Sequence, residues 1–426
     1  MKGDAPISGS KQKETAIIHG ARFAFGPHAT VDASIGIAAG RIDRIHTCAS
    51  RRGAPASSAQ EIDLSGFLVM PGLINAHDHL GLALFPPMAD SLYPNYIAWG
   101  ENIHNKFPQE ISKHRAVPLE DRLWWGGIRN LLCGVTCVSH HDPLWPTLQR
   151  ADFPVRVVQQ NGWAHSLALG GDLFAVRAAT PKGRAFVLHA CEGVDRVAQD
   201  ELWELDRLGL LDSSTVLVHG LAIDRKGVAL MIARHASLIV CPSSNYFLYG
   251  KLPDLTLLGE IERVALGSDS PVSAEGDLLD EIRFAIDRCG VSPERAYRMV
   301  TSIPAQVLRL YDAVGTIKES GVADFIAVWD TGGAPADKLQ TLSLHEIEFV
   351  MIGGRVQLAS ETVLERLPIF ERYGLEPLSV GATTRWLRAP VNDLLRRTEE
   401  VLGKNEVRLG SRSLSLPAYA EVQHAR

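Results

Sequence analysis

Short apolar runs rich in β-branched residues alternate with amphipathic helical stretches from Leu68 to about Asp312. Such alternation is typical of repeated βα units built on a parallel sheet. The clear strand candidates are Leu73 to His77, Val135 to His140, Val155 to Gln159, Ala185 to Ala190, Thr215 to His219, Ser237 to Cys241 and Arg263 to Gly267. A weaker run near Ser166 to Leu169 would make eight. This number favours an α/β fold with a closed (β/α)8 barrel of the TIM type over an open doubly wound sheet, and no glycine-rich phosphate loop follows any of the strands.

Runs of β type also lie on both sides of this region. They fill much of residues 15–67 and return at Ala323 to Trp329 and Phe349 to Ile352. Gly, Pro and Asp punctuate them, as expected of a small antiparallel sheet. We therefore predict one discontinuous β-sandwich domain from residues 15–67 and 322–380. Residues 68–321 would form the barrel, and residues 381–426 a helical C-terminal tail.

The overall composition is that of a soluble globular protein, with 46% hydrophobic and 22% charged residues. The formal net charge of −6 and the lack of a basic cluster argue against nucleic acid as a partner. The segment Met1 to Glu14 is polar and has no apolar block of a secretory signal, and no apolar run is long enough to cross a bilayer. We expect a cytoplasmic protein without a membrane partner, and leave a homodimer open.

Two histidines separated by one residue close the first strand candidate. Alternate side chains of an extended strand share a face, so His77 and His79 should point the same way and Asp78 the opposite way. Two imidazoles on one face can bind one metal ion from adjacent positions. Taken alone, the motif could equally be a pair of surface histidines at a strand end.

Three later strands also end in side chains suited to metal binding or acid–base chemistry. His189 ends one strand and Glu192 follows it, His219 ends the next strand, and Asp269 follows the last. Each has a structural alternative: hydrogen-bonded packing for a histidine, a helix cap for Asp269, and the first turn of a helix for Glu192. Barrel enzymes carry their chemistry at the C-terminal ends of the strands. Together, the strand ends predict one metal-dependent site.

In these motifs the chain resembles the amidohydrolase superfamily. Within it, the resemblance is to the mononuclear aminohydrolases, which include cytosine, guanine and S-adenosylhomocysteine deaminases and triazine hydrolases. The resemblance extends from about residue 15 to 360. The motifs that carry it are Pro71-Gly72-Leu73-Ile74-Asn75-Ala76-His77-Asp78-His79, His189-Ala190-Cys191-Glu192, Val218-His219-Gly220, Cys241-Pro242-Ser243-Ser244-Asn245 and Gly267-Ser268-Asp269.

The resemblance implies one divalent metal ion, with zinc favoured and iron as the alternative. Its implied ligands are His77, His79, His189 and Asp269. The ion would lower the pKa of a bound water. In the binuclear branch of the superfamily, a carboxylated lysine on the fourth strand bridges two metals. The only lysine between the third and fifth strands here is Lys182, in a turn, so one metal is favoured.

Catalytic roles are also implied for three residues. Asp269 would accept the proton of the water, and His219 would orient or polarise the resulting hydroxide. Glu192 would carry a proton to a ring nitrogen and on to the leaving amine. The expected activity is hydrolysis of a carbon–nitrogen bond other than a peptide, most simply deamination of an amino-substituted heterocycle. A cyclic amide hydrolase or a ring dechlorinase is the alternative chemistry, and a non-catalytic scaffold barrel is the alternative class.

The substrate side is less defined by the sequence. Trp99 lies in the loop after the first strand, His140 and His141 lie at the second strand end, and Asn245 follows the seventh strand. Flat aromatic walls with a few polar contacts suit a planar heterocycle. Loop packing for Trp99 and a simple turn at Asn245 are equally acceptable. Only Asn161 to Arg184 fills the interval between the third and fifth strands, so the barrel is expected to be locally abbreviated there.

Overall fold

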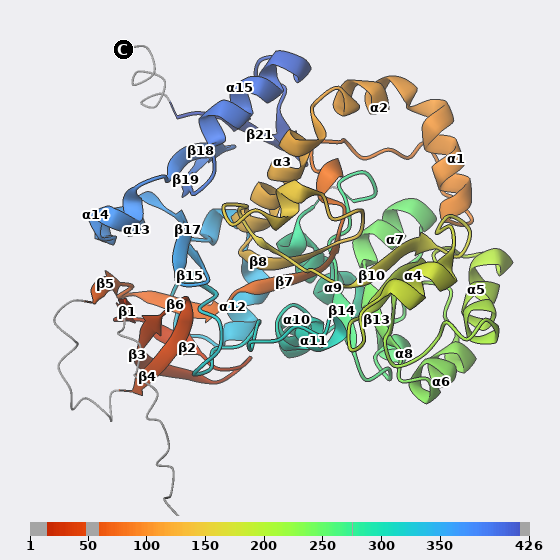
Figure 1. The fold of residues 1–426 in the computed structure, drawn as a ribbon, viewed down its shortest axis with the longest axis horizontal. Helices are drawn as coiled ribbons and strands as arrows, with labels where there is room; N and C mark the ends of the chain where they lie inside the picture. The colour runs from red at the N-terminus through yellow and green to blue at the C-terminus, as the bar shows by residue number, and fades with distance from the viewer. Residues whose placement is uncertain (1–14, 48–58, 275, 418–426) are drawn as a thin grey trace, which may run out of the picture.

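The computed structural model describes residues 15–47, 59–274 and 276–417, so the polar leader up to Glu14 lies outside the described residues. Two parallel sheets occupy the middle of the chain, and a mixed sheet built from its N-terminal and C-terminal parts lies next to them (Figure 1). Within the described ranges, no helix combines the length and the apolar character needed to span a membrane.

Eight parallel strands form the two central sheets. One sheet has the order β7-β8-β9 and the other the order β10-β11-β12-β13-β14. The strands are β7 Leu73–Asp78, β8 Val135–His140, β9 Arg156–Val157, β10 Gly162–Ser166, β11 Phe186–Ala190, β12 Thr215–His219, β13 Ser237–Val240 and β14 Val264–Leu266. Most are fully buried, because parallel strands are covered on both faces. This burial explains why they read as continuous apolar runs.

The two sheets meet where β14 passes β7. The backbone N–H of Asp269 donates to the carbonyl of His77 at 3.1 Å. Gly267 packs so closely that a Cβ atom there would lie 2.6 Å from the Cβ of His77. This position therefore requires glycine, and it holds the last strand end against the first.

The fourth strand lies earlier than the sequence pattern predicts. The weak run was expected at Ser166 to Leu169, but β10 spans Gly162–Ser166 and a turn follows at residues 167–169. Trp163 and His165 are only half-buried, which breaks the apolar run that would have marked the strand. Four residues, 158–161, join β9 to β10, whereas the helix α4 (Leu173–Ala179) joins β10 to β11. The expected abbreviation therefore takes the form of a missing helix between β9 and β10.

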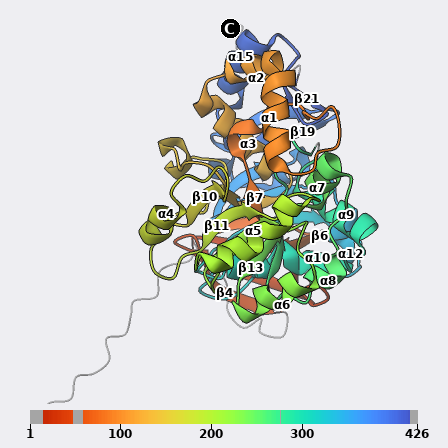
Figure 2. The ribbon, with the colours of Figure 1, turned by 90° about the vertical axis from the view of Figure 1, so that its right-hand side faces the viewer.

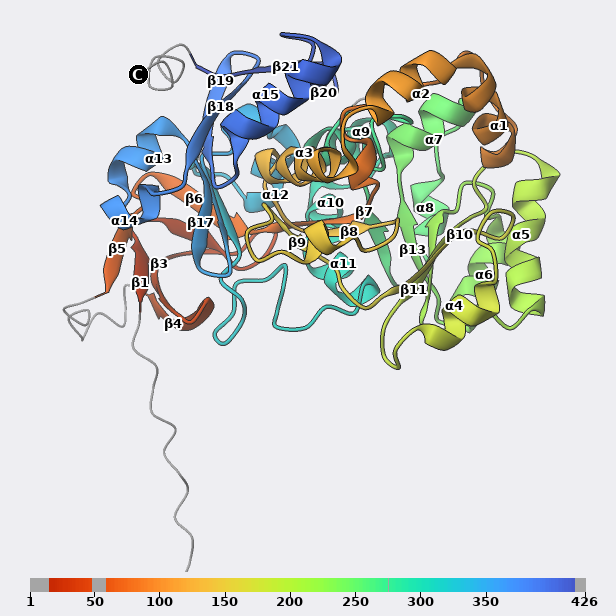
Figure 3. The same cartoon turned by 45° about the horizontal axis from the view of Figure 1, so that its top comes forward.

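Helices pack over the parallel sheets, and Figures 2 and 3 show α5 and α6 on the outer side of the five-stranded sheet. The helices of this region include α3 Leu119–Leu132, α5 Arg196–Arg207, α6 Arg225–Ala233, α9 Leu278–Cys289, α10 Pro293–Met299 and α11 Ser302–Val307. Asp195, Asp224 and Asp277 cap the starts of α5, α6 and α9 by accepting backbone N–H bonds. Such caps satisfy donors that a helix start leaves unpaired.

The mixed sheet joins segments from before and after the central strands. β6 (Phe67–Pro71) pairs in parallel with β2 (Arg22–Ala24) and antiparallel with β15 (Phe325–Trp329). The other strands of this sheet are β1 Ala16–His19, β3 Thr30–Ala38, β4 Arg41–Thr47, β5 Gln60–Asp63, β16 Phe349–Ile352, β17 Arg355–Ala359, β18 Glu376–Val380, β19 Thr383–Leu387, β20 Arg408–Leu409 and β21 Arg412–Ser415. The boundaries of separate domains within this arrangement stay a prediction.

The expectation of a helical tail at residues 381–426 is wrong for most of its described part, which contains strands as well as one helix. One helix, α15 (Val391–Leu402), lies between β19 and the β20–β21 hairpin, and β21 pairs with β18. Arg385 of β19 is buried and donates to the carbonyl of Ile347, so a charged residue interrupts the apolar pattern of this strand. The sequence pattern misses the strand for that reason.

Candidate metal and catalytic site

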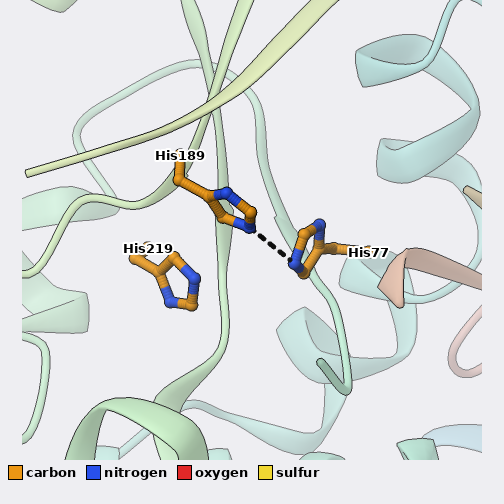
Figure 4. Close-up of side chains that lie close together, drawn as sticks. All are labelled: His77, His189 and His219. Atoms are coloured by element: carbon orange, nitrogen blue, oxygen red, sulfur yellow. Dashed lines mark hydrogen bonds between the residues drawn. The ribbon is translucent and has the colours of Figure 1, made fainter. Parts of the chain in front are cut away.

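Four side chains from three strand ends converge at one point. His77 and His79 come from the end of β7, His189 from β11, and Asp269 follows β14. Nε2 of His77 lies 3.2 Å from Nε2 of His189 and 3.6 Å from Oδ1 of Asp269. Nε2 of His79 lies 3.9 Å from the same Oδ1. Figure 4 shows His77 and His189 pointing toward each other, with His219 beside them.

These separations have the size of a metal site. Ligand atoms about 2.0–2.1 Å from a tetrahedral ion lie about 3.3 Å from one another. Two overlapping groups, His77 with His79 and Asp269, and His77 with His189 and His219, each have ligand atoms within 4.8 Å of one another. Imidazole nitrogens with a carboxylate oxygen are donors suited to zinc or ferrous iron. The residues present therefore fit a divalent metal ion.

Hydrogen bonds on the outer side of the rings orient two of the histidines. Nδ1 of His189 lies 2.8 Å from the carbonyl of His165, and Nδ1 of His79 lies 3.0 Å from Asp142. A carbonyl or carboxylate oxygen can only accept, so both Nδ1 atoms carry the proton. When the ring is neutral, the lone pair of each Nε2 therefore points to the convergence point, as metal-binding histidines require.

Burial and neighbouring charge act differently on these histidines. Burial lowers the pKa of His77 and holds that of His189 well below its ordinary value, which favours the neutral ring that a metal needs. Burial also opposes protonation of His79, but the charge and hydrogen bond of Asp142 outweigh it and raise its pKa to about 9. A metal ion at this position would have to displace a proton from His79.

The carboxylate of Asp269 is held in one orientation. Its Oδ2 accepts hydrogen bonds from the hydroxyls of Ser244 and Ser273, both at 2.8 Å, and its Oδ1 accepts from the N–H of Ser270. Burial alone would raise the pKa of Asp269, but contact with His77 and the other imidazoles holds it well below its ordinary value. The anionic form is thus stabilised, with Oδ1 turned to the histidines.

Glu192 and His219 lie next to this group. Nε2 of His219 is 3.5 Å from Oε2 of Glu192, and the amide nitrogen of Asn245 donates to Nδ1 of His219 at 3.2 Å. Both Glu192 and His219 are buried. Burial raises the pKa of the Glu192 carboxyl, which brings it closer to neutral pH. A carboxyl group in this state can both donate and accept a proton.

Three residues at the strand ends of this site have strained backbone conformations. Cys191, His219 and Asp269 have φ angles of 55°, 76° and 54°, in the left-handed region that non-glycine residues rarely occupy. Such conformations cost of order 1–3 kcal/mol each and persist where the surroundings enforce them. All three lie at or shortly after the ends of β11, β12 and β14, so this strain coincides with the candidate site.

A buried polar network lies on the opposite side of β7. Asp78 points away from the histidines and accepts from Arg129 at 2.9 Å and from Asn130 at 2.7 Å. Asn75 donates to Ser268 at 2.8 Å and accepts from its N–H at 3.0 Å. The network links the end of β7 to the segment that carries Asp269.

The four residues predicted to contact a substrate occupy different environments. The Trp99 indole donates to the carbonyl of Met88 within an apolar cluster, as in its loop-packing alternative. His140 accepts from the backbone N–H of Leu80, and Asn245 bonds to His219 as described. His141 lies beside the metal cage, the group formed by His77, His79, His189 and Asp269. Its ring centroid is 4.3 Å from that of His189.

Nδ1 of His141 has no hydrogen-bond partner among the described residues. Its Nε2 donates to the carbonyl of Ala164 at 3.0 Å, so the lone pair is on Nδ1. Burial holds the pKa of His141 well below its ordinary value, which keeps the ring neutral. Among the four predicted contacts, this residue retains the strongest claim on geometry.

Several residues of the site were not predicted from the sequence. Asp142, Ser244, Ser273 and Tyr249 each bond to one of the cage or catalytic residues. Ser244 belongs to the motif Cys241-Pro242-Ser243-Ser244-Asn245, and Asp142 follows two histidines at a strand end, so the sequence carries a signal for both. The sequence carries no such signal for Tyr249 and Ser273. Tyr249 is 57 residues from Glu192, and Ser273 reaches Asp269 only through the conformation of the loop between them.

A wide groove of about 800 Å³ lies elsewhere, between α7 (Pro242–Tyr249) and α9. Tyr246, Phe284 and Arg412 contribute to its lining, and no residue of the metal cage does. The chemistry is therefore assigned to the buried cage and not to this groove.

Comparison of the sequence with known proteins agrees with this geometry. The pattern of the amidohydrolase family matches residues 164–357. The 5-methylthioadenosine/S-adenosylhomocysteine deaminase of Haloquadratum walsbyi is 24% identical over 421 residues, which cover 84% of this chain and 91% of the relative. The enzyme of the same name from Natronomonas pharaonis is 27% identical over 405 residues, with coverages of 82% and 91%.

Solved structures with a similar fold include two zinc complexes. Atrazine chlorohydrolase from Arthrobacter aurescens TC1, complexed with zinc, has a TM-score of 0.69 and 16% identity over 91% of this chain and 100% of its own. An adenosine deaminase from Xanthomonas campestris with bound zinc has a TM-score of 0.65 and 18% identity, covering 91% and 98%. At these identities the likeness concerns the fold.

Proposed function

This chain is a member of the amidohydrolase superfamily and a hydrolase of carbon–nitrogen bonds other than peptide bonds, and from this premise we propose that it deaminates an amino-substituted heterocycle with the help of one metal ion. The observation that carries the proposal is the buried carboxyl of Glu192, 3.5 Å from His219 and adjacent to the histidine–aspartate cage. We propose that the two parallel sheets close into a single, locally abbreviated (β/α)8 barrel around this site.

The proposed ligands are His77, His79, His189 and Asp269, and the proposed metal is zinc, with iron as the alternative. A divalent ion held there would supply Lewis acidity and lower the pKa of a coordinated water. His219 is not included, because its Nδ1 bonds to Asn245 and its Nε2 faces Glu192. Described strand β10 carries no lysine, which is consistent with a single ion.

The remaining chemistry is assigned to three side chains. Asp269 takes a proton from the water at Oδ1, the oxygen that faces the histidines, while the hydroxyls of Ser244 and Ser273 hold Oδ2. His219 donates from Nε2 and orients the attacking oxygen. Glu192 gives its proton to the ring nitrogen, recovers one from the hydroxyl newly added to the ring and passes it to the departing amine, which its raised pKa allows. The proton held by Asp269 then restores Glu192 for the next turnover.

The substrate class is proposed from the relatives and from His141. Both relatives named above are deaminases of adenine-containing compounds by name. A neutral imidazole with a lone pair on Nδ1 can accept a hydrogen bond from a ring or exocyclic N–H. We therefore place aminopurines first, before pyrimidines, pterins and triazines.

Ammonia release from a panel of these compounds tests the function. The panel begins with 5-methylthioadenosine, S-adenosylhomocysteine and adenosine, and includes dihydropyrimidine lactams and a chlorotriazine. We expect ammonia from at least one amino-substituted ring and none after chelation of the metal. Hydrolysis of the lactams or release of chloride without any ammonia would replace deamination by the alternative chemistry.

Asp142→Asn is expected to weaken metal binding by about 10–100-fold. The amide lacks the negative charge with which Asp142 holds the Nδ1–H of His79 and increases the basicity of this ring. Competition with a chromogenic chelator measures the affinity, and elemental analysis of the wild-type protein should find one ion per chain. Asp152→Asn, in an exposed pair with Arg150, is the matched control. Two ions per chain would contradict the single-metal proposal, and an unchanged affinity would remove Asp142 from it.

A further inference from the structure

We infer that Tyr249 is a positioning residue that fixes the carboxyl group of Glu192 for proton transfer. This inference rests on the proposed function and adds a residue to which the sequence motifs gave no role. The hydroxyl of Tyr249 donates to Oε1 of Glu192 at 2.6 Å, across 57 residues of sequence. Both side chains are only about 5% exposed, so water competes little for this bond.

Tyr249 is itself held firmly. It is the last residue of α7, and Gly250 ends the helix in the left-handed conformation with φ 65°. The tyrosine ring packs in an apolar cluster with Tyr93, Leu221 and Leu248. The backbone of Leu248 also accepts from the N–H of Tyr93, which ties α7 to the long segment after β7. The hydroxyl is therefore presented from a fixed point.

The two oxygens of Glu192 consequently have different tasks. Oε1 is occupied by Tyr249, while Oε2 faces Nε2 of His219 at 3.5 Å. The terminal torsion of a glutamate is broad and nearly two-fold, so packing alone does not fix the plane of the carboxyl. The tyrosine hydroxyl fixes it and leaves Oε2 as the oxygen that exchanges a proton with the substrate.

Tyr249→Phe removes only this hydroxyl. With the substrate found in the ammonia screen, we expect kcat to fall about 10- to 100-fold, the size of a lost hydrogen bond to a charged group. KM should change less than about 3-fold, because a group that acts only on the proton-transfer step leaves ground-state binding intact. Metal content should remain that of the wild type.

Two comparisons separate positioning from general structural damage. Tyr297→Phe is the matched control, because the Tyr297 hydroxyl is buried and has no hydrogen-bond partner among the described residues. It should leave kcat unchanged. In the Glu192→Gln background, Tyr249→Phe should cause little further loss of kcat, since it acts through Glu192. An equal loss in both backgrounds, or no loss in either, would overturn the inference.

A second readout does not depend on activity. The unfolding midpoints of the wild type, Tyr249→Phe, Glu192→Ala and the double variant form a cycle, and they should be non-additive if the hydroxyl and carboxyl interact, because alanine cannot accept from Tyr249. If no compound in the panel releases ammonia, deamination fails as the function while this cycle still decides about the contact. Additive midpoints would overturn the inference even where deamination is found.

Discussion

Glu192→Gln is expected to lower kcat by about 10²–10⁴-fold while the protein keeps its metal. Glutamine has nearly the same shape and can still accept from Tyr249, but it cannot donate and recover a proton at neutral pH. The carboxyl is not one of the proposed ligands, so metal content should not follow activity. Steady-state kinetics together with elemental analysis of the same sample measure both quantities.

Glu204→Gln provides the matched control for this change. Glu204 lies on α5 in an exposed pair with Arg207, and the same replacement there should leave kcat within about 2-fold of the wild type. A Glu192→Gln variant with wild-type kcat would remove Glu192 from the proton-transfer step. Loss of the metal together with activity would mean that Glu192 contributes to the assembly of the cage instead.

Arg129→Met should reduce the free energy of unfolding by about 3–5 kcal/mol. Arg129 is 5% exposed and donates at 2.9 Å to Asp78, a fully buried carboxylate. It also donates at 2.6 Å to the carbonyl of Gly276, so it joins α3 to the segment after β14. Its removal leaves a buried charge with only amide donors, which costs far more than the loss of an exposed pair.

Denaturant unfolding with linear extrapolation measures this loss, with both proteins saturated with zinc. Arg207→Met is the control, because Arg207 is 68% exposed and its pair with Glu204 should contribute less than about 1 kcal/mol. A loss for Arg129→Met no larger than that of the control would show that Asp78 is satisfied by its other partners.

Local patterns predicted much of the two parallel sheets. The strand β12 has the predicted bounds, Thr215–His219, and β8 has those of Val135–His140. Such buried strands combine a short apolar run with a polar residue at the end, which a single sequence displays directly. The predicted position of β10 was too late in the chain, because the half-buried Trp163 and His165 interrupt the apolar run that marks the other strands.

The histidine pair on β7 was predictable for the same reason, because the two-residue period of a strand is a local property. The meeting of His77 with His189 is not local, since 112 residues separate them. β7 and β11 belong to different sheets, and their C-terminal ends come together because the two parallel sheets meet where β14 passes β7. The sequence predicted that these ends share an edge but not how closely the side chains approach.

The sequence by itself therefore determined which residues stand at the strand ends, because strand periodicity and side-chain chemistry are written in adjacent residues. The tertiary structure alone decided which partners hold them: Asp142 on His79, two serines on Asp269, and Tyr249 on Glu192. A hydrogen bond depends on distance and direction to within a few tenths of an ångström. Residues far apart in the chain reach that precision only when the packed core fixes their backbones.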